Sequence, residues 1–155
     1  MTSSRGRLRG LYAITPGTAD TASLVARSRM ALEGGARLLQ YRAKAADPAA
    51  ALDQARALAA ECRRAGALFI VNDSIDLALA AGADGVHVGR DDAGIAAARK
   101  RLPKGIVGVS CYADPELARA AAAAGADYVA IGSVYPSRTK PGAVRAPLEA
   151  IAAAG

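Results

Sequence analysis

The sequence predicts an α/β fold in which parallel strands alternate with helices. Six short apolar segments have the length and composition of buried parallel strands. Alanine-rich segments of helical character lie between them. Several of these segments end in a glycine shortly before the next strand, as at Gly66, Gly82 and Gly125, where glycine can adopt the left-handed conformation that ends a helix. These observations predict a repeated unit of strand and helix.

The expected elements follow one another along the chain. The strands are expected at Leu11–Thr15, Leu38–Arg42, Leu68–Asn72, Gly85–Gly89, Ile106–Ser110 and Tyr128–Gly132. The helices are expected at Thr21–Glu33, Pro48–Arg64, Ile75–Ala81, Ala93–Leu102 and Pro115–Ala124. Residues 1–10 are expected to form a basic tail, and residues 11–155 a single domain.

This alternation fits two architectures, a βα barrel or an open doubly wound sheet. Both bind ligands at the carboxyl ends of the strands. A dinucleotide-binding sheet has the pattern GxGxxG after its first strand, but residues 15–20 read TPGTAD. No GxxxxGK[ST] phosphate loop occurs either, so an NTPase is not expected.

Composition argues against several other classes of protein. The net charge is +6, but Arg5, Arg7 and Arg9 lie in the tail and aromatic residues make up only 4%, so nucleic-acid binding is not expected. No segment resembles a signal peptide or a membrane span. Cys62 and Cys111 form no metal-binding pattern and are expected to be buried hydrophobic residues. We expect a cytoplasmic protein.

Polar side chains follow the second expected strand. Alternation along an extended segment places Gln40, Arg42 and Lys44 on the same side. One amide and two cations together suit the oxygens of a phosphate or diphosphate. A salt bridge to a neighbouring carboxylate inside the barrel explains the two cations equally well.

Carboxylates follow the third and fourth expected strands. Asn72 and Asp73 end one of these strands, and Asp92 follows the other. Asp73 and Asp92 could hold Mg²⁺, which binds one or two carboxylates together with substrate phosphate oxygens. Each of these aspartates alone could instead cap a helix, and Asp91 is expected to be such a cap. His87, the only histidine, is expected to have a structural role.

Hydroxyl groups end the last two expected strands. Ser110 could bond a ligand, or it could be a residue of a turn. Ser137, Thr139 and Lys140 lie in a polar loop that could contact a second phosphate group or could be a simple surface turn. Taken together, the strand ends predict magnesium-assisted chemistry on a diphosphate.

The order and spacing of these motifs resemble those of thiamine phosphate synthases, which are (βα)8-barrel enzymes of thiamine biosynthesis. The matching segments are residues 11–15, 40–44, 71–73, 85–89, 108–110, 125–129 and 135–140. The resemblance implies a transferase that joins 4-amino-5-hydroxymethyl-2-methylpyrimidine diphosphate to 4-methyl-5-(2-phosphooxyethyl)thiazole, releasing diphosphate. It also implies a magnesium cofactor.

The resemblance further implies a role for each site residue. Asp73 and Asp92 would bind magnesium. The diphosphate would be held by Gln40, Arg42, Lys44, Asn72 and Lys140. Ser110 would lie beside the pyrimidine and its reactive carbon, and Ser137 and Thr139 would bind the thiazole phosphate. The catalytic residues would be Ser110, Lys140 and Arg42.

The sequence departs from the family pattern in two places. Arg90 stands where family members usually have glutamine, which adds a cation beside the proposed metal carboxylates. The chain also ends at Gly155 after about six βα units, whereas such barrels usually exceed about 200 residues. We therefore expect an incomplete, C-terminally truncated barrel that could associate with a second copy or a completing fragment. The alternatives are a thiazole tautomerase-like enzyme and a non-catalytic module that binds phosphate ligands.

Overall fold

Strands and helices alternate throughout the part of the chain that the structure describes. The structure is a computed structural model, and it describes residues 6, 8–42, 47–89, 94–136, 142 and 144–154. The strands are β1 (Leu11–Ile14), β2 (Ala36–Tyr41), β3 (Leu68–Asn72), β4 (Gly85–Val88), β5 (Ile106–Tyr112) and β6 (Tyr128–Ile131). The helices are α1 (Thr21–Glu33), α2 (Pro48–Ala65), α3 (Ile75–Ala81), α4 (Gly94–Arg101), α5 (Pro115–Ala123) and α6 (Leu148–Ala153).

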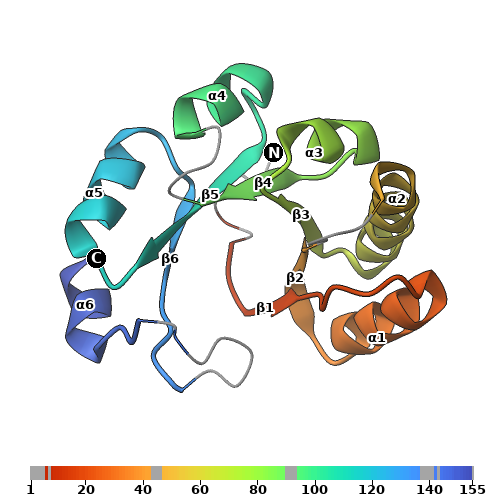
Figure 1. Cartoon of the computed structure of the whole chain (residues 1–155), viewed down its shortest axis with the longest axis horizontal. Coiled ribbons are helices and arrows are strands. Elements are labelled where there is room, and N and C mark those ends of the chain that lie inside the picture. Colours follow the sequence, from red (N-terminus) through yellow and green to blue (C-terminus); the bar gives the residue numbers. More distant parts are fainter. Residues whose placement is uncertain are drawn as a thin grey trace.

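The strands form one parallel sheet in the order β1-β2-β3-β4-β5-β6. A doubly wound sheet would reverse its strand order at a switch point, so the unbroken order favours the barrel over the open sheet. The sheet curls, and its helices lie on the convex side (Figure 1). The α/β prediction is confirmed, with a half-barrel of six strands in which β1 and β6 lie at the two edges of the described sheet.

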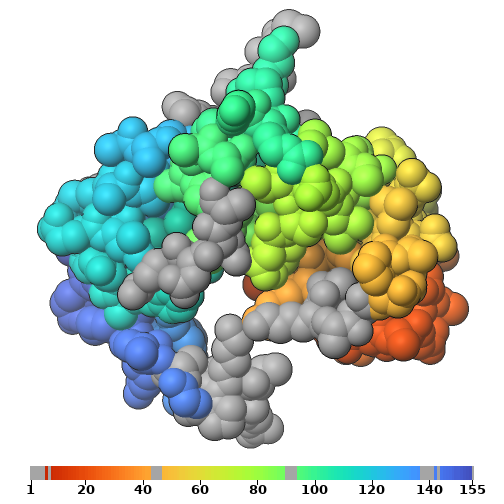
Figure 2. Space-filling view, turned by 45° about the horizontal axis from the view of Figure 1, so that its top comes forward, coloured from red at the N-terminus to blue at the C-terminus, as the bar shows by residue number. Residues whose placement is uncertain are grey.

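The two faces of the curled sheet bury different side chains. The larger apolar core lies between the sheet and the helices and includes Leu39, Phe69 and Val107. A smaller cluster of four buried residues, Leu38, Leu68, Ile70 and Ile106, comes from alternate positions of the strands and therefore lies on the concave face. Figure 2 shows the molecule hollowed near its centre, between the orange to green N-terminal half and the cyan to blue C-terminal half.

The helices begin and end largely where local sequence signals place them. Helices α1, α2, α3 and α5 each begin with a capping side chain that accepts a hydrogen bond from a backbone N–H of the first turn. These capping residues are, in order, Asp20, Asp47, Ser74 and Asp114. Gly66 and Gly82 end α2 and α3 with φ of 67° and 63°, a conformation that favours glycine. These caps explain why the expected bounds of α1 and α3 are correct.

Two expected strand boundaries were wrong by two residues because tertiary pairing decides them, and one helix was not expected. Strand β2 begins at Ala36, which pairs with Leu11 of β1, two residues before the expected start. Strand β5 continues to Tyr112, which pairs with Ile131 beyond an irregularity in the ladder. Helix α6 was not expected, since Pro147 precedes it and no side chain caps its first turn.

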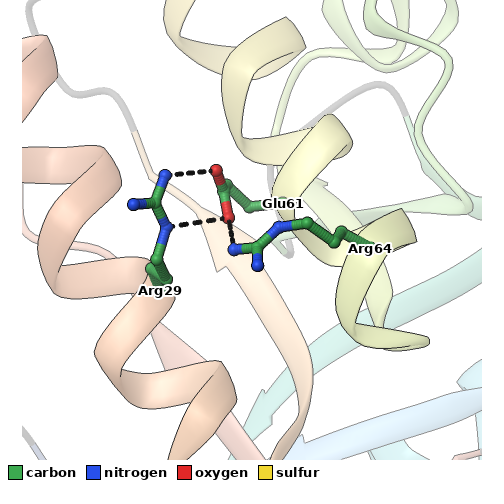
Figure 3. Close-up of polar contacts among 3 residues, drawn as sticks. All are labelled: Arg29, Glu61 and Arg64. Atoms are coloured by element: carbon green, nitrogen blue, oxygen red, sulfur yellow. Dashed lines mark hydrogen bonds and ion pairs between the residues drawn. The ribbon is translucent and has the colours of Figure 1, made fainter.

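Helices α1 and α2 are joined on the surface by a cluster of charged residues. Arg29 of α1 contacts Glu61 of α2 through two hydrogen bonds, of 2.8 and 3.2 Å, and Arg64 contacts the same carboxylate (Figure 3). These hydrogen bonds hold the pKa of Glu61 down at about 2. No described helix is long and apolar enough to cross a membrane.

Candidate active site at the carboxyl ends of the strands

The carboxyl end of β2 carries two of the expected site residues. Gln40 lies within the strand, and its side chain is only 4% exposed. Its amide Nε2 donates to the Tyr12 hydroxyl of β1 over 2.9 Å, which uses one of the two amide hydrogens. Arg42 follows the strand and is half-buried, and its backbone N–H donates to Thr15 Oγ1 over 3.0 Å. A hydrogen bond to Thr15, the residue that follows β1, therefore fixes the backbone of Arg42.

The carboxyl end of β3 places Asn72 and Asp73 next to β4. The Asn72 amide donates to Asp73 Oδ2 over 2.6 Å, and the Asp73 N–H donates to the carbonyl of His87 over 2.8 Å. Asp73 is exposed and has a φ of 65°, a left-handed conformation that costs a non-glycine residue on the order of 1 kcal/mol. Strain of this kind is concentrated at functional sites.

The interpretation of Asp73 as a helix cap was wrong. Ser74 occupies the cap position of α3, because its Oγ accepts the N–H of Leu77 over 3.1 Å. The side chain of Asp73 is thus not used to begin the helix. Its exposed carboxylate at a strand end has the hard oxygen donors that Mg²⁺ prefers, so this residue fits the role of a magnesium ligand. Among the described residues, no three His, Cys, Asp or Glu side chains are grouped as a complete metal site.

Ser110 belongs to β5 and is not a turn residue, which corrects that alternative. Its Oγ lies 2.8 Å from His87 Nε2 on the neighbouring strand β4. His87 Nδ1 lies 2.9 Å from the Tyr128 hydroxyl of β6, and that hydroxyl lies 2.7 Å from the Tyr12 hydroxyl of β1.

These contacts form one chain of hydrogen bonds, which we call the interior chain. It runs from Gln40 through Tyr12, Tyr128 and His87 to Ser110, and each member comes from a different strand. Two expected ligand-binding residues, Gln40 and Ser110, stand at its ends. The expectation that His87 is an oriented interior residue agrees with its 6% exposure.

The tyrosines of the interior chain remain neutral. Burial raises the pKa of Tyr12 and also raises the pKa of Tyr128. Both hydroxyls therefore keep their hydrogens at neutral pH and can each donate one hydrogen bond. A chain of neutral donors and acceptors can then extend between the two edge strands without a buried charge on either tyrosine.

Gly108 makes room for the Tyr128 ring on the concave face. A Cβ atom at this position would lie 2.0 Å from Cζ and 2.3 Å from the hydroxyl of Tyr128. Any side chain here would displace the ring from its contacts with His87, whose ring centroid lies 5.6 Å from that of Tyr128. The glycine two residues before Ser110 is therefore part of the same arrangement.

Several expected site residues lie outside the described residues. They are Lys44, Arg90, Asp91, Asp92, Ser137, Thr139 and Lys140. Their predicted roles stay predictions. Within the described part, Gln40, Arg42, Asn72, Asp73 and Ser110 all lie at or near the carboxyl ends of three strands, β2, β3 and β5.

Sequence reasoning missed Tyr12 and Tyr128 as members of the site. The available signal was their position, since each is an aromatic residue with a hydroxyl within a short strand that is otherwise apolar. That signal does not tell which face of the sheet a side chain occupies. Register supplies it here, because Tyr12 pairs with Leu38 and Tyr128 pairs with Gly108, both on the concave face.

The cysteines behave as small apolar residues, as expected. Both are free and buried, Cys62 in α2 and Cys111 in β5. Burial raises the pKa of the Cys62 thiol to about 12 and also raises the pKa of Cys111. A thiol with a raised pKa is a poor nucleophile at neutral pH.

Comparison with known proteins identifies the family. The model of the thiamine monophosphate synthase family matches residues 11–154. The chain belongs to this family. It is 60% identical over 144 residues to a thiamine-phosphate synthase of Aromatoleum aromaticum, covering 92% of this chain and 69% of that protein. A thiamine-phosphate synthase of Chromobacterium violaceum is 58% identical over 94% of this chain and 71% of its own length.

A solved structure agrees with the family assignment. The thiamine phosphate pyrophosphorylase of Pyrococcus furiosus superimposes with a TM-score of 0.77 and 39% sequence identity. The match covers 86% of this chain and 64% of the Pyrococcus chain. This chain therefore spans a little under two thirds of that structure and about 70% of the two curated relatives.

Proposed function

We propose that this chain has the activity named for its relatives, thiamine phosphate synthesis. The observation that carries the proposal is the family match over residues 11–154, together with the positions of Gln40, Arg42, Asn72, Asp73 and Ser110 around one end of the sheet. The substrates would be 4-amino-5-hydroxymethyl-2-methylpyrimidine diphosphate and 4-methyl-5-(2-phosphooxyethyl)thiazole.

The proposed reaction needs a stabilised leaving anion and an aligned nucleophile. The bond between the pyrimidine methylene carbon and the diphosphate oxygen breaks, and diphosphate leaves with the bonding electrons. The thiazole nitrogen then forms a bond to the pyrimidine-stabilised methylene cation. Positioning and charge stabilisation supply most of the acceleration in such a reaction. The mechanism needs no thiol nucleophile, and both cysteines are buried with a raised pKa, which makes them poor nucleophiles.

Each site residue would contact a particular part of the substrates. Arg42 would bind diphosphate oxygens, because a guanidinium presents a fork of N–H donors to such groups. The second amide hydrogen of Gln40 and the Asn72 amide would contribute further hydrogen bonds. Ser110 would contact the pyrimidine diphosphate from β5. Lys44 and Lys140 are proposed to add cationic charge, while Ser137 and Thr139 would bind the thiazole phosphate.

A magnesium cofactor is part of the proposal. Asp73 would be one ligand, supported by its exposed carboxylate and left-handed backbone, and Asp92 would be the other. When bound, Mg²⁺ would neutralise part of the charge that develops on the leaving diphosphate.

The test is to incubate the purified chain with both substrates, with and without Mg²⁺, and to measure thiamine phosphate and diphosphate. Magnesium-dependent formation of both products in equal amounts would support the proposal. Arg42→Gln is expected to reduce the rate, while Arg27→Gln, which changes an exposed arginine of α1, serves as a matched control. Binding of the pyrimidine diphosphate without turnover by a folded chain would favour the phosphate-binding alternative instead.

A further inference from the structure

The interior chain has a direction that follows from its donors and acceptors. The Gln40 amide donates to the Tyr12 oxygen, so the Tyr12 hydrogen is free to be donated onward to Tyr128. The Tyr128 hydrogen is then donated to His87 Nδ1. A neutral imidazole that accepts at Nδ1 carries its hydrogen on Nε2, and this hydrogen points at Ser110 Oγ.

The opposite direction moves the unpaired hydrogen from Ser110 to Tyr12. If Ser110 donated to His87 Nε2, then His87 would donate from Nδ1 to Tyr128, and Tyr128 to Tyr12. The Tyr12 oxygen would accept from both Tyr128 and Gln40. Its own hydrogen would have no acceptor among the residues that the structure describes. The first direction also leaves one hydrogen without a described acceptor, but that hydrogen is on the half-buried Ser110 near the carboxyl end of β5, where a ligand or water can accept it. In the opposite direction the unpaired hydrogen is on the Tyr12 hydroxyl, which lies between Gln40 and Tyr128, and leaving a partly buried donor unpaired costs about 1–3 kcal/mol. The first direction is therefore favoured.

We propose that Tyr128 and His87 are positioning residues that hold the Ser110 hydroxyl as a hydrogen-bond donor toward the ligand. In the favoured direction, Ser110 accepts from His87 and retains its own hydrogen. No acceptor for that hydrogen is present within the described ranges, and Ser110 lies at the end of the sheet where the ligand is proposed to bind. The inference rests on the proposed function for the identity of its ligand, the pyrimidine diphosphate.

Two features of the structure support a positioning role for Tyr128 in particular. Its ring crosses the concave face of β5 to reach His87 on β4, and Gly108 leaves the space for that crossing. Tyr128 also packs edge to face against Tyr12, with ring centroids 5.7 Å apart. The ring is thus held from two sides, and its hydroxyl has little freedom to leave His87 Nδ1.

The first measurement does not depend on catalysis. Because His87 is the only histidine, a protein labelled with ¹⁵N-histidine gives one imidazole signal set by NMR, and its nitrogen shifts report the tautomer. At about pH 8, where an ordinary histidine is neutral, we expect the hydrogen on Nε2. A hydrogen predominantly on Nδ1 would overturn the proposal. Added pyrimidine diphosphate should shift the His87 signals in the wild type and much less in Ser110→Ala.

The second measurement uses kinetics of the complete reaction. Tyr128→Phe removes only the hydroxyl and is expected to lower kcat about 10-fold while KM changes less than about twofold, the size expected for one lost hydrogen bond. Adding Tyr128→Phe to Ser110→Ala should cause little further loss, because Tyr128 acts through Ser110. Independent, multiplying losses would contradict a positioning role.

Two variants separate positioning from a general loss of structure. Tyr41→Phe removes the hydroxyl of another interior tyrosine, which is buried and donates to Gln54 over 2.6 Å outside the interior chain, and it should leave kcat unchanged. His87→Gln retains an N–H donor that can reach Ser110, so it should keep more activity than His87→Ala. Equal losses in both His87 variants would contradict the proposal.

These experiments distinguish failure of the proposed function from failure of the positioning inference. An inactive wild type that nevertheless shows the Nε2 tautomer and the Ser110-dependent shift would contradict the proposed function and keep the positioning inference. An active wild type in which Tyr128→Phe has full activity would contradict the inference and keep the function.

Discussion

At the amino ends of the strands, Asp84 and Asp127 bond to backbone, whereas at the carboxyl end of β3 Asp73 presents an exposed carboxylate. Asp84 accepts the N–H of Phe69 over 2.8 Å, and Asp127 accepts the N–H of Val107 over 2.9 Å. Each of these aspartates joins the start of its own strand to the strand before it. Asp73 instead has a left-handed backbone and a side-chain contact from Asn72.

The comparison teaches that position within the repeat decides what an aspartate does. Asp84 and Asp127 both follow Gly-Ala, and the two copies of this Gly-Ala-Asp sequence make the same bond to the preceding strand. Asp127 is further fixed by an ion pair with Arg99 of α4. These stabilising bonds lie at one end of the sheet, and the ligand is proposed to bind at the other end, as βα barrels generally divide the two roles.

The largest expected effect is the loss of stability in Asp127→Ala. This change removes the acceptor for the Val107 N–H and leaves Arg99 without its carboxylate partner. We expect the free energy of unfolding to fall by about 3 kcal/mol, measured by urea denaturation. Asp114→Ala, which removes only the cap of α5, should cost about 1 kcal/mol. A smaller loss in Asp127→Ala than in this control would refute the structural role.

Asp73→Asn is expected to lose activity while keeping its stability, the reverse of Asp127→Ala. Removing the charge should lower magnesium-dependent activity about 100-fold, because the proposed interaction is ionic and strongest as diphosphate leaves. The free energy of unfolding should change by less than about 1 kcal/mol, since Ser74 and not Asp73 caps α3. Asp84→Asn is the matched control at the other end, and it should lose stability while keeping its activity per folded molecule. If Asp73→Asn lost stability and activity together, Asp73 would have a structural role like that of Asp84 and Asp127, and the comparison would be wrong.

Gly108→Ala tests the concave face of the sheet, between the amino and carboxyl ends of its strands. The added Cβ would overlap the Tyr128 ring, and relieving that overlap should cost about 2 kcal/mol of unfolding free energy. The NMR signals of His87 should shift as its contact with Tyr128 weakens. Val109→Ala, which trims a buried residue on the convex face, should reduce stability without moving those signals. Unchanged His87 signals in Gly108→Ala would show that the ring is not confined as the structure indicates.

The smallest expected effect concerns a carboxylate at neither end of the sheet, Glu61. Its folded pKa of about 2 lies below the ordinary value of 4.5, chiefly because Arg29 and then Arg64 donate hydrogen bonds to it. A depressed carboxyl pKa stabilises the folded state above pH 4.5, and this contribution is lost as the pH falls toward 2. Since both arginines are well exposed, Glu61→Gln should cost only about 1 kcal/mol at neutral pH.

Denaturation of Glu61→Gln and the wild type at a series of pH values checks this assignment. The difference between them should shrink as the pH falls through that interval. Glu33→Gln, which alters an exposed carboxylate at the end of α1, provides the control. A difference that persists unchanged at the lowest pH would show that the ion pairs are not its source.

Much of the fold could be predicted from local signals. Thr21–Glu33, Leu68–Asn72 and Ile75–Ala81 have the expected bounds, because apolar runs and capping residues act within a few positions of one another. The expected positions of Gln40 and Asn72 near the ends of their strands were also correct, whereas Ser110 lies two residues before the end of β5. Strand alternation did not predict the hydrogen bond from Gln40 to Tyr12, because the two residues are 28 positions apart along the chain.

The sequence by itself determined the alternation of strands and helices, the positions of most helix ends and the concentration of polar residues at the carboxyl ends. These depend on short-range backbone preferences and on burial of apolar segments. Only the tertiary structure decided the interior chain, in which Tyr12 and Tyr128 meet across 116 positions of sequence. Their contact requires the curl of the sheet, the inward register of five strands and the space over Gly108, and each of these arises from packing between distant segments.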